Sequence, residues 1–295
     1  MGDCPPTPVG ISPVQELLLT VILADEESAL AAWEKVRSRF SVDSLEPGSF
    51  QVMPMLAERL LALDLGHPDL PRLRGMRRQA SWRARLAAHD AAAFVSAVQR
   101  APAAHLAWDG PPLSSLLYGE SWRRPITGLE VVVPAECLRS VVESLAGDGW
   151  VPMRRRLARL RSRGVHAVRW RSPSGLPCAV RPDLPEDLLG EPGLVRDNVW
   201  RGSTQTDLDE VTIDVPAPVD VLSHVTLARK RAAPDRRCLW LADAARALQH
   251  PALDGAELQR RLDMSGPDDS LPTALRLLAR AGVRVGEMHS RGSAR

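Results

Sequence analysis

His105–Trp150 reads HLAWDGPPLSSLLYGESWRRPITGLEVVVPAECLRSVVESLAGDGW, and the rest of the chain is arranged around it. A short apolar segment ends at Asp109-Gly110, which predicts a strand followed by a glycine turn. The residues Leu116-Leu117-Tyr118 predict a helical turn, and the apolar run Leu129–Val133 predicts a second strand. The expected order is therefore strand, glycine turn, short helix and a strand that carries one acid, Glu130.

Three motifs in this stretch resemble the core of a bacterial family of uncharacterised nucleotidyltransferases, which have the polymerase-beta type of fold. The family pattern is L-K-G, a helix ending in L-Y, and then R-P-x-x-D-[IL]-D-L-L-V. This chain has Trp108-Asp109-Gly110, Leu117-Tyr118 and Arg124–Val133 at the same spacing. The similarity extends from helical residues near Arg77 to Trp240–Asp243, where the family often has W-L-L-D. The resemblance implies an α+β protein whose small mixed β-sheet core is flanked by helical regions.

The chain is expected to divide into five regions, in the order of the sequence. Residues 1–10 are expected to form a disordered N-terminus and residues 11–101 a helical N-terminal region. Residues 102–215 are expected to form a nucleotidyltransferase-like α/β core. A helical C-terminal region at 216–285 and a disordered tail at 286–295 are expected to follow. Ser12-Pro13 predicts the start of the first helix, because proline suits the first helical position. Gly75 is a candidate break in a later helical pattern that spans 70–99.

The second half of the chain is expected to hold a hairpin, an extended segment and four helices. The hairpin joins Val165–Trp170 to Leu176–Val180 through a Ser-Pro-Ser-Gly turn, and the extended segment is Val211–Val215. The helices are expected at residues 219–229, 236–249, 256–262 and 273–281.

Composition limits the partners and the location of the protein. The net charge is +2, from 38 basic and 36 acidic residues, so no overall field favours nucleic acid or a membrane as a partner. The four cysteines are far apart and lack the spacing of a zinc site, so we expect them to be reduced and structural. No charged-then-apolar leader is present, and Leu17–Ala24 is too short to span a bilayer, so we expect a cytoplasmic protein.

The resemblance also identifies which catalytic groups this chain lacks. Nucleotidyl transfer uses two metal ions held by converging carboxylates, which the family supplies from D-x-D and from a third acid on a later strand. The corresponding residues here are Gly128, Glu130 and Ala179. The family lysine is replaced by Asp109, and Pro111 removes a backbone N–H from the glycine turn. We therefore expect no metal site and no cofactor, with Mg²⁺ and ATP bound only in the alternative that the chain is an atypical active enzyme.

Two interpretations of the remaining acids stay open. Asp109 and Glu130 are the candidate catalytic residues, as a carboxylate pair that performs general acid/base chemistry on a different substrate. Alternatively, they are solvated or form salt bridges with Arg123 or Arg124. Two tryptophans flank the expected cleft and are candidates for stacking on a ligand. The candidate cleft residues are Trp108, Gly110, Tyr118, Trp122, Arg123, Arg124 and Gly128.

The densest positive charge follows the central stretch. Six arginines fall within ten residues and form a candidate patch for an anion or a partner: Arg154, Arg155, Arg156, Arg159, Arg161 and Arg163. The alternative is a solvated helix or linker. A second group of arginines, between Arg72 and Arg85, is either a basic ridge or a solvated helix face.

These observations favour a degenerate nucleotidyltransferase-like protein that acts as an accessory protein in a bacterial biosynthetic or peptide-modifying pathway. Its expected partner is a small molecule or an acidic peptide or protein. Two alternatives remain, namely an enzyme repurposed for non-nucleotidyl chemistry in the same cleft and an atypical metal-dependent nucleotidyltransferase.

Overall fold

The structure is a computed structural model that describes residues 11–46, 48–153, 167–184, 196–228, 238–264 and 270–283. The described residues fall into two compact units. One is Ser81–Ala217, and the other is formed by described residues within Met1–Ala80 and Pro218–Arg295. Helices and two small sheets make up the chain, so the predicted α+β class is confirmed. The expected disordered ends, 1–10 and 286–295, lie outside the described residues.

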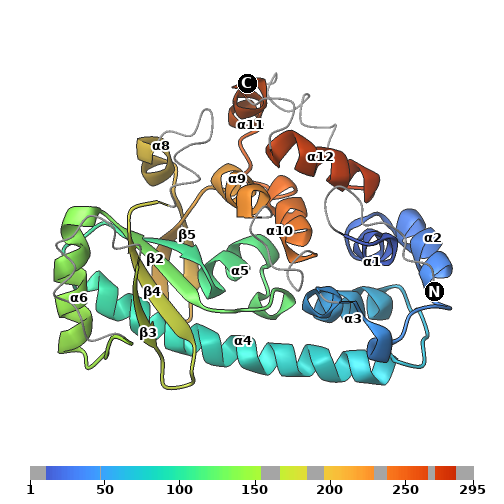
Figure 1. The fold of residues 1–295 in the computed structure, drawn as a ribbon, viewed down its shortest axis with the longest axis horizontal. Helices are drawn as coiled ribbons and strands as arrows, with labels where there is room; N and C mark the ends of the chain where they lie inside the picture. The colour runs from blue at the N-terminus through green and yellow to red at the C-terminus, as the bar shows by residue number, and fades with distance from the viewer. Residues whose placement is uncertain are drawn as a thin grey trace. The chain divides into compact units, whose positions relative to one another are not determined.

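The unit Ser81–Ala217 contains a mixed four-stranded sheet, drawn in green and yellow in Figure 1. The strand order is β1 (Leu106–Asp109), β2 (Leu129–Val133), β4 (Pro177–Pro182) and β3 (Val168–Arg171). β2 and β4 are parallel, whereas β1 pairs with β2 and β3 pairs with β4 in the antiparallel sense. The predicted end of β1, the bounds of β2 and the hairpin are confirmed.

Two helices cover one face of this sheet. They are the later part of α4 (Leu70–Gln99) and α6 (Leu138–Gly147), whose apolar residues share one core with β2 and β4. Phe94 is a fully buried member of this core and makes edge contacts with the rings of Trp150 and Trp170. Because side chains alternate along a strand, the other face of β2 carries Glu130.

The remaining elements of this unit connect the strands. α5 (Pro111–Tyr118) and the 3-10 turn η3 (Ser121–Arg123) join β1 to β2, and η4 (Ala135–Cys137) leads into α6. After α8 (Arg196–Arg201), β5 (Thr204–Leu208) and β6 (Val211–Val215) form an antiparallel two-stranded sheet.

The other unit is helical. Its N-terminal part holds α1 (Pro13–Leu23), α2 (Glu26–Val36), η1 (Val42–Ser44), η2 (Ser49–Val52), α3 (Met53–Ala62) and the start of α4. Its C-terminal part holds α9 (Pro218–Ala228), α10 (Leu239–Leu248), α11 (Gly255–Met264) and α12 (Ser270–Arg280). As predicted, Ser12 caps α1 and Pro13 is its first residue. No helix in the described ranges is long and apolar enough to cross a membrane.

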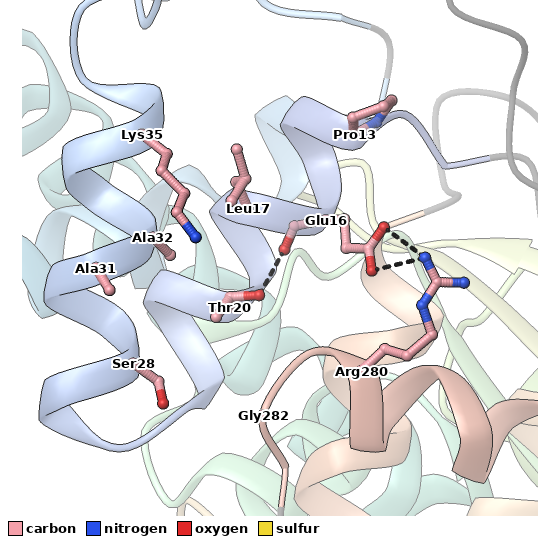
Figure 2. A pocket seen from close by; sticks show the side chains of 10 residues that line it. All are labelled: Pro13, Glu16, Leu17, Thr20, Ser28, Ala31, Ala32, Lys35, Arg280 and Gly282. Atoms are coloured by element: carbon pink, nitrogen blue, oxygen red, sulfur yellow. Dashed lines mark hydrogen bonds and ion pairs between the residues drawn. The ribbon is translucent and has the colours of Figure 1, made fainter.

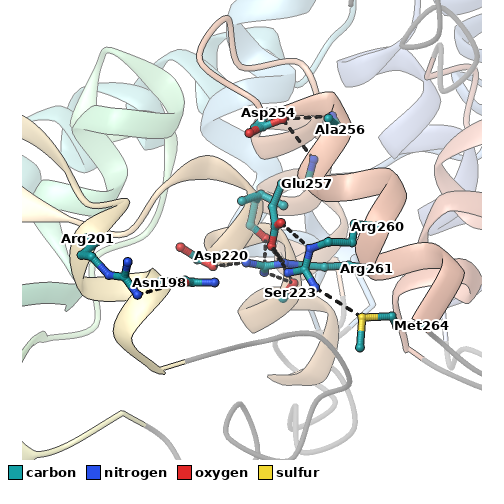
Figure 3. A network of polar contacts seen from close by, with 11 residues as sticks. Asn198, Arg201, Asp220, Ser223, Asp254, Ala256, Glu257, Arg260, Arg261 and Met264 are labelled. Atoms are coloured by element: carbon teal, nitrogen blue, oxygen red, sulfur yellow. Dashed lines mark hydrogen bonds and ion pairs between the residues drawn. The ribbon is translucent and has the colours of Figure 1, made fainter.

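A buried polar network joins α9 to α11 (Figure 3). Arg261 is 4% exposed, and its Nη2 lies 2.5 Å from Oδ1 of Asp220, which is 2% exposed. The same guanidinium donates to Ser223 Oγ at 2.9 Å and to Glu257 Oε1 at 2.8 Å. Burial raises the pKa of Asp220 and Arg261 partly offsets that rise, whereas hydrogen bonds from Arg260 lower the pKa of Glu257. The ionised groups satisfy one another, so the network holds the two helices in one arrangement.

The prediction of a helix break at Gly75 needs correction, and some elements were not predicted. Gly75 does not break the helical pattern, because α4 is continuous from Leu70 to Gln99. A single glycine costs a helix only about 1 kcal/mol relative to alanine, which the packing of a helix can offset. α6, α8 and β5 were not predicted from the sequence.

Candidate functional site

Glu130 and Arg181 form an ion pair on one face of the sheet. Glu130 is the register partner of Ala179 across the parallel strands β2 and β4. Arg181 lies two residues further along β4, so its side chain leaves the same face as that of Ala179. Its Nε donates to Glu130 Oε1 at 2.5 Å, and both side chains are 26% exposed. The one acid that this chain keeps at the family positions is therefore bonded to a cation from the neighbouring strand.

Asp109 bonds to the backbone and to an arginine at the glycine turn. Its Oδ1 accepts a hydrogen bond from the backbone N–H of Gly110 at 2.7 Å and lies 2.9 Å from Nη1 of Arg124. The Arg124 side chain is 9% exposed, so this pair is partly withdrawn from water. The salt-bridge interpretation of Asp109 is thus confirmed for Arg124. For Glu130 it needs a correction, because the partner observed is Arg181 rather than Arg123 or Arg124.

The backbone is closely packed at Gly110 and Gly128. Gly110 has a φ of 103°, and a Cβ built on it would lie 2.5 Å from the carbonyl oxygen of Gly128. A Cβ built on Gly128 would lie 2.8 Å from the carbonyl oxygen of Pro177. Position 128 is where the family has its first acid. A side chain there would require the backbone of β2 or of β4 to move.

The start of α5 offers few hydrogen-bond donors. Pro111 and Pro112 have no N–H, so two of the donors at the N-terminus of a helix are missing. The N–H of Gly110 is directed to Asp109, and the N–H of Ser114 bonds to the Gly110 carbonyl. The sequence prediction included the missing N–H of Pro111 but not that of Pro112.

The predicted cleft residues differ in exposure. Trp108 is 1% exposed and Tyr118 is 4% exposed, so both are core residues. The expectation that Trp108 stacks on a ligand is therefore wrong, since a buried ring presents no free face. Trp122 is half-buried, and its Nε1 donates to Glu120 Oε2 at 3.2 Å. The Arg123 guanidinium lies 5.5 Å from the centre of the Trp122 ring and donates to the Tyr118 carbonyl at 2.8 Å.

No substitute for the missing acids is found in the parts of the chain that the structure describes. Within them, no group of three or more His, Cys, Asp or Glu side chains is placed to hold a metal ion. Asp183 donates its N–H to the Val133 carbonyl, and its Oδ1 accepts from the N–H of Leu184. Both bonds of Asp183 lie at the end of β4, four residues along the chain from Ala179.

The arginine patch predicted from the sequence falls outside the described residues. This applies to Arg154, Arg155, Arg156, Arg159, Arg161 and Arg163, so the patch stays a prediction. In the second arginine group, Arg72 is bonded to Asp43 at 2.8 Å and 2.9 Å, which makes it part of a surface salt bridge.

Arg181 is the site residue that the sequence analysis missed. A signal for it was present, because residues 179 and 181 have the same parity on a strand and must share a face. What the sequence does not show is the parallel register that brings β4 beside Glu130.

Two comparisons with known proteins gave matches. The profile of the family described as "Uncharacterised nucleotidyltransferase" matches residues 50–281. The crystal structure of an antigenic nucleotidyltransferase-like protein from Paracoccidioides brasiliensis is 16% identical to this chain, with a TM-score of 0.37, over 65% of this chain and 91% of that chain. No curated protein matches the chain significantly. Because the family profile covers more than half of its length, this chain belongs to the uncharacterised nucleotidyltransferase family.

Proposed function

We propose that this chain does not transfer nucleotides by a two-metal mechanism and instead acts as an accessory protein that binds a ligand or partner. The observation that carries the proposal is the bond between Arg181 Nε and Glu130 Oε1. A guanidinium occupies the side of Glu130 that faces Ala179, from which a family member's third acid would help to hold the metal ions.

The donor set at the three family positions does not fit a pair of Mg²⁺ ions. Gly128 and Ala179 have no carboxylate, and the Pro177 carbonyl leaves no room for a side chain at position 128. Mg²⁺ requires oxygen ligands in near-octahedral geometry, and one ion-paired glutamate supplies too few. A cation already neutralises Glu130, so the electrostatic reason for a metal to bind there is removed.

The glycine turn, where family members are expected to bind the phosphates, is also poorly suited to a triphosphate in this chain. A glycine turn before a helix binds phosphate through backbone N–H groups and the positive end of the helix dipole. Here Asp109, which is itself paired with Arg124, accepts the Gly110 N–H, and Pro111 and Pro112 donate nothing. A triphosphate would meet a carboxylate where the family pattern has a lysine.

The groups that we propose for binding are cationic and aromatic. Arg181 uses its Nε for the bond to Glu130, so its two Nη groups can donate to a ligand, and its side chain is 26% exposed. Trp122 and Arg123 form a cation–π pair at the η3 turn. Planar guanidinium groups and an aromatic ring suit an anionic small molecule or an acidic peptide, which are the proposed ligands.

The test is an assay of pyrophosphate release from the four ribonucleoside triphosphates with Mg²⁺ and with Mn²⁺. Wild-type protein and the Glu130→Gln variant should give the same background signal, because Glu130 holds no metal. Divalent-dependent pyrophosphate release by the wild type that is lost in E130Q would overturn the proposal and establish an active enzyme.

A further inference from the structure

A pocket of about 530 Å³ is formed by α1, α2, the last residue of α12 and Gly282 just beyond it, and it shares no residue with the sheet site (Figure 2). This volume lies within the range of roughly 300–1,000 Å³ that is typical of small-molecule sites. The residues that line it are Pro13, Glu16, Leu17, Thr20, Ser28, Ala31, Ala32, Lys35, Arg280 and Gly282.

Two helical stripes form its long walls. The α1 residues that line the pocket are 13, 16, 17 and 20, and the α2 residues are 28, 31, 32 and 35. Both sets follow the spacing i, i+3, i+4, i+7, which places each set on one face of its helix. Seven residues of helix extend about 10 Å, so the groove between the stripes accepts an elongated ligand. The groove is open on the α2 side because Ser28, Ala31 and Ala32 have small side chains, and only Lys35 in this stripe is long.

Gly282 closes the pocket at the end of α12. It has a φ of 77°, which ends the helix in the left-handed conformation. A Cβ built on it would lie 2.9 Å from the Cβ of Ala24 and 3.9 Å from the Cβ of Ser28. The chain beyond α12 can therefore approach α1 and α2 this closely only with glycine at that position.

The charges in the pocket favour an anion. Glu16 and Arg280 pair with each other at 3.1 Å, and Thr20 Oγ1 donates to the Glu16 carbonyl. Lys35 has no hydrogen-bond or ion-pair partner in the ranges that the structure describes, and Figure 2 shows its side chain reaching from α2 toward α1. Two cations and one anion leave a net charge of +1, which one carboxylate balances.

We propose that this pocket binds a small monocarboxylate with an elongated apolar body. Lys35 contacts the carboxylate of the ligand, and Leu17, Ala31 and Ala32 contact its hydrocarbon. A free carboxylic acid and the C-terminus of a short apolar peptide offer this same chemistry. A single ion pair and a short chain give a dissociation constant on the order of 1 mM or tighter.

The composition of the chain allows a direct test, because its only lysines are Lys35 and Lys230. Reductive methylation of the full chain with isotope-labelled formaldehyde gives each lysine its own NMR signal, and Lys35→Arg assigns one of them. Octanoate and N-acetyl-leucyl-leucine are the probes, with octylamine as the probe of opposite charge. The Lys35 signal should shift and saturate with either carboxylate or both, and the responding probe identifies the source of the ligand. Octylamine should not shift it.

Two variants exclude non-specific binding. Lys35→Gln should abolish the heat of octanoate binding in calorimetry, and Ala31→Leu, at an exposed position on the rim, should weaken it at least about tenfold by filling the groove. Arg37→Gln removes a similar charge from the end of α2 at a residue that pairs with Glu34 and does not line the pocket, so it should change nothing. An unsaturable Lys35 shift with both carboxylates, or equal binding by wild type and K35Q, would overturn the proposal.

Discussion

Arg181 and Glu130 are bonded across the parallel strands β2 and β4, with Nε and Oε1 2.5 Å apart. A double-mutant cycle with Glu130→Gln and Arg181→Gln should give a coupling free energy of about 1 kcal/mol, since the pair is charge-assisted and three-quarters withdrawn from water. Urea unfolding of the four proteins measures it.

The control for this cycle is Arg139–Glu143, an exposed pair on α6 of the same unit. Its coupling should be clearly smaller, because water screens both groups. Equal coupling in the two pairs would show that the bond between Glu130 and Arg181 has no special strength.

Gly128 should not tolerate a side chain. Gly128→Ala should lower the free energy of unfolding by about 1–3 kcal/mol, because the new Cβ would meet the Pro177 carbonyl at 2.8 Å. Gly66→Ala is the matched control, since nothing lies within 4 Å of a Cβ built there. An unchanged free energy of unfolding in Gly128→Ala would contradict this, because it would mean that a side chain fits at position 128 without a movement of the sheet.

Arg261 should be required for the packing of α9 against α11. Arg261→Ala leaves Asp220 buried without its counter-charge and should cost about 3–5 kcal/mol in urea unfolding. Arg260→Ala, next to it and exposed, should change stability little.

The loss of unfolding free energy in the Arg261→Ala variant should depend on pH. Burial raises the pKa of Asp220, and removal of Arg261 raises it further. A carboxyl whose pKa is raised in the folded state stabilises the fold most at a pH below its unfolded-state pKa. That stabilisation is lost as the pH rises through the folded-state pKa. The difference in unfolding free energy between wild type and Arg261→Ala should therefore be largest near neutral pH and become smaller in acid. A difference that grows in acid would contradict this account of Asp220.

The cysteines should react very unequally with iodoacetamide. Cys178 and Cys238 are each 1% exposed, and burial raises the pKa of both thiols to about 12. The thiolate is the reactive form, so in the folded protein near pH 8 neither should be alkylated. Cys137 is only half-buried and should react. Mass spectrometry of peptides from folded and urea-unfolded protein measures this, and fast labelling of Cys178 in the folded state would contradict the packing of β4.

Local signals explain which elements the sequence could predict. β2 is a continuous apolar run interrupted only by Glu130, and its bounds were predicted from that pattern. α6 carried a readable signal that was overlooked, since Leu138, Val141, Val142 and Leu145 recur at helical spacing. β5 had no such signal, because four of its five residues are polar and its pairing with β6 alone makes it a strand.

The site was less predictable than the fold because its contacts join distant residues. Sequence showed which family acids are missing, and it offered Arg124 as a partner for Asp109. It did not show that Arg181 lies beside Glu130, since that depends on the register of two strands about fifty residues apart. Nor could it show that the Pro177 carbonyl fills the space beside Gly128, or that Trp108 is buried.

Calorimetric titration of the full chain with Mg-ATP tests the central claim most directly. With Arg181 on Glu130 and Asp109 at the glycine turn, we predict no saturable heat at micromolar ligand concentrations, with or without Mg²⁺, in wild type and in Glu130→Gln alike. A micromolar, magnesium-dependent affinity in the wild type that disappears in E130Q would contradict the account and identify a working nucleotide site.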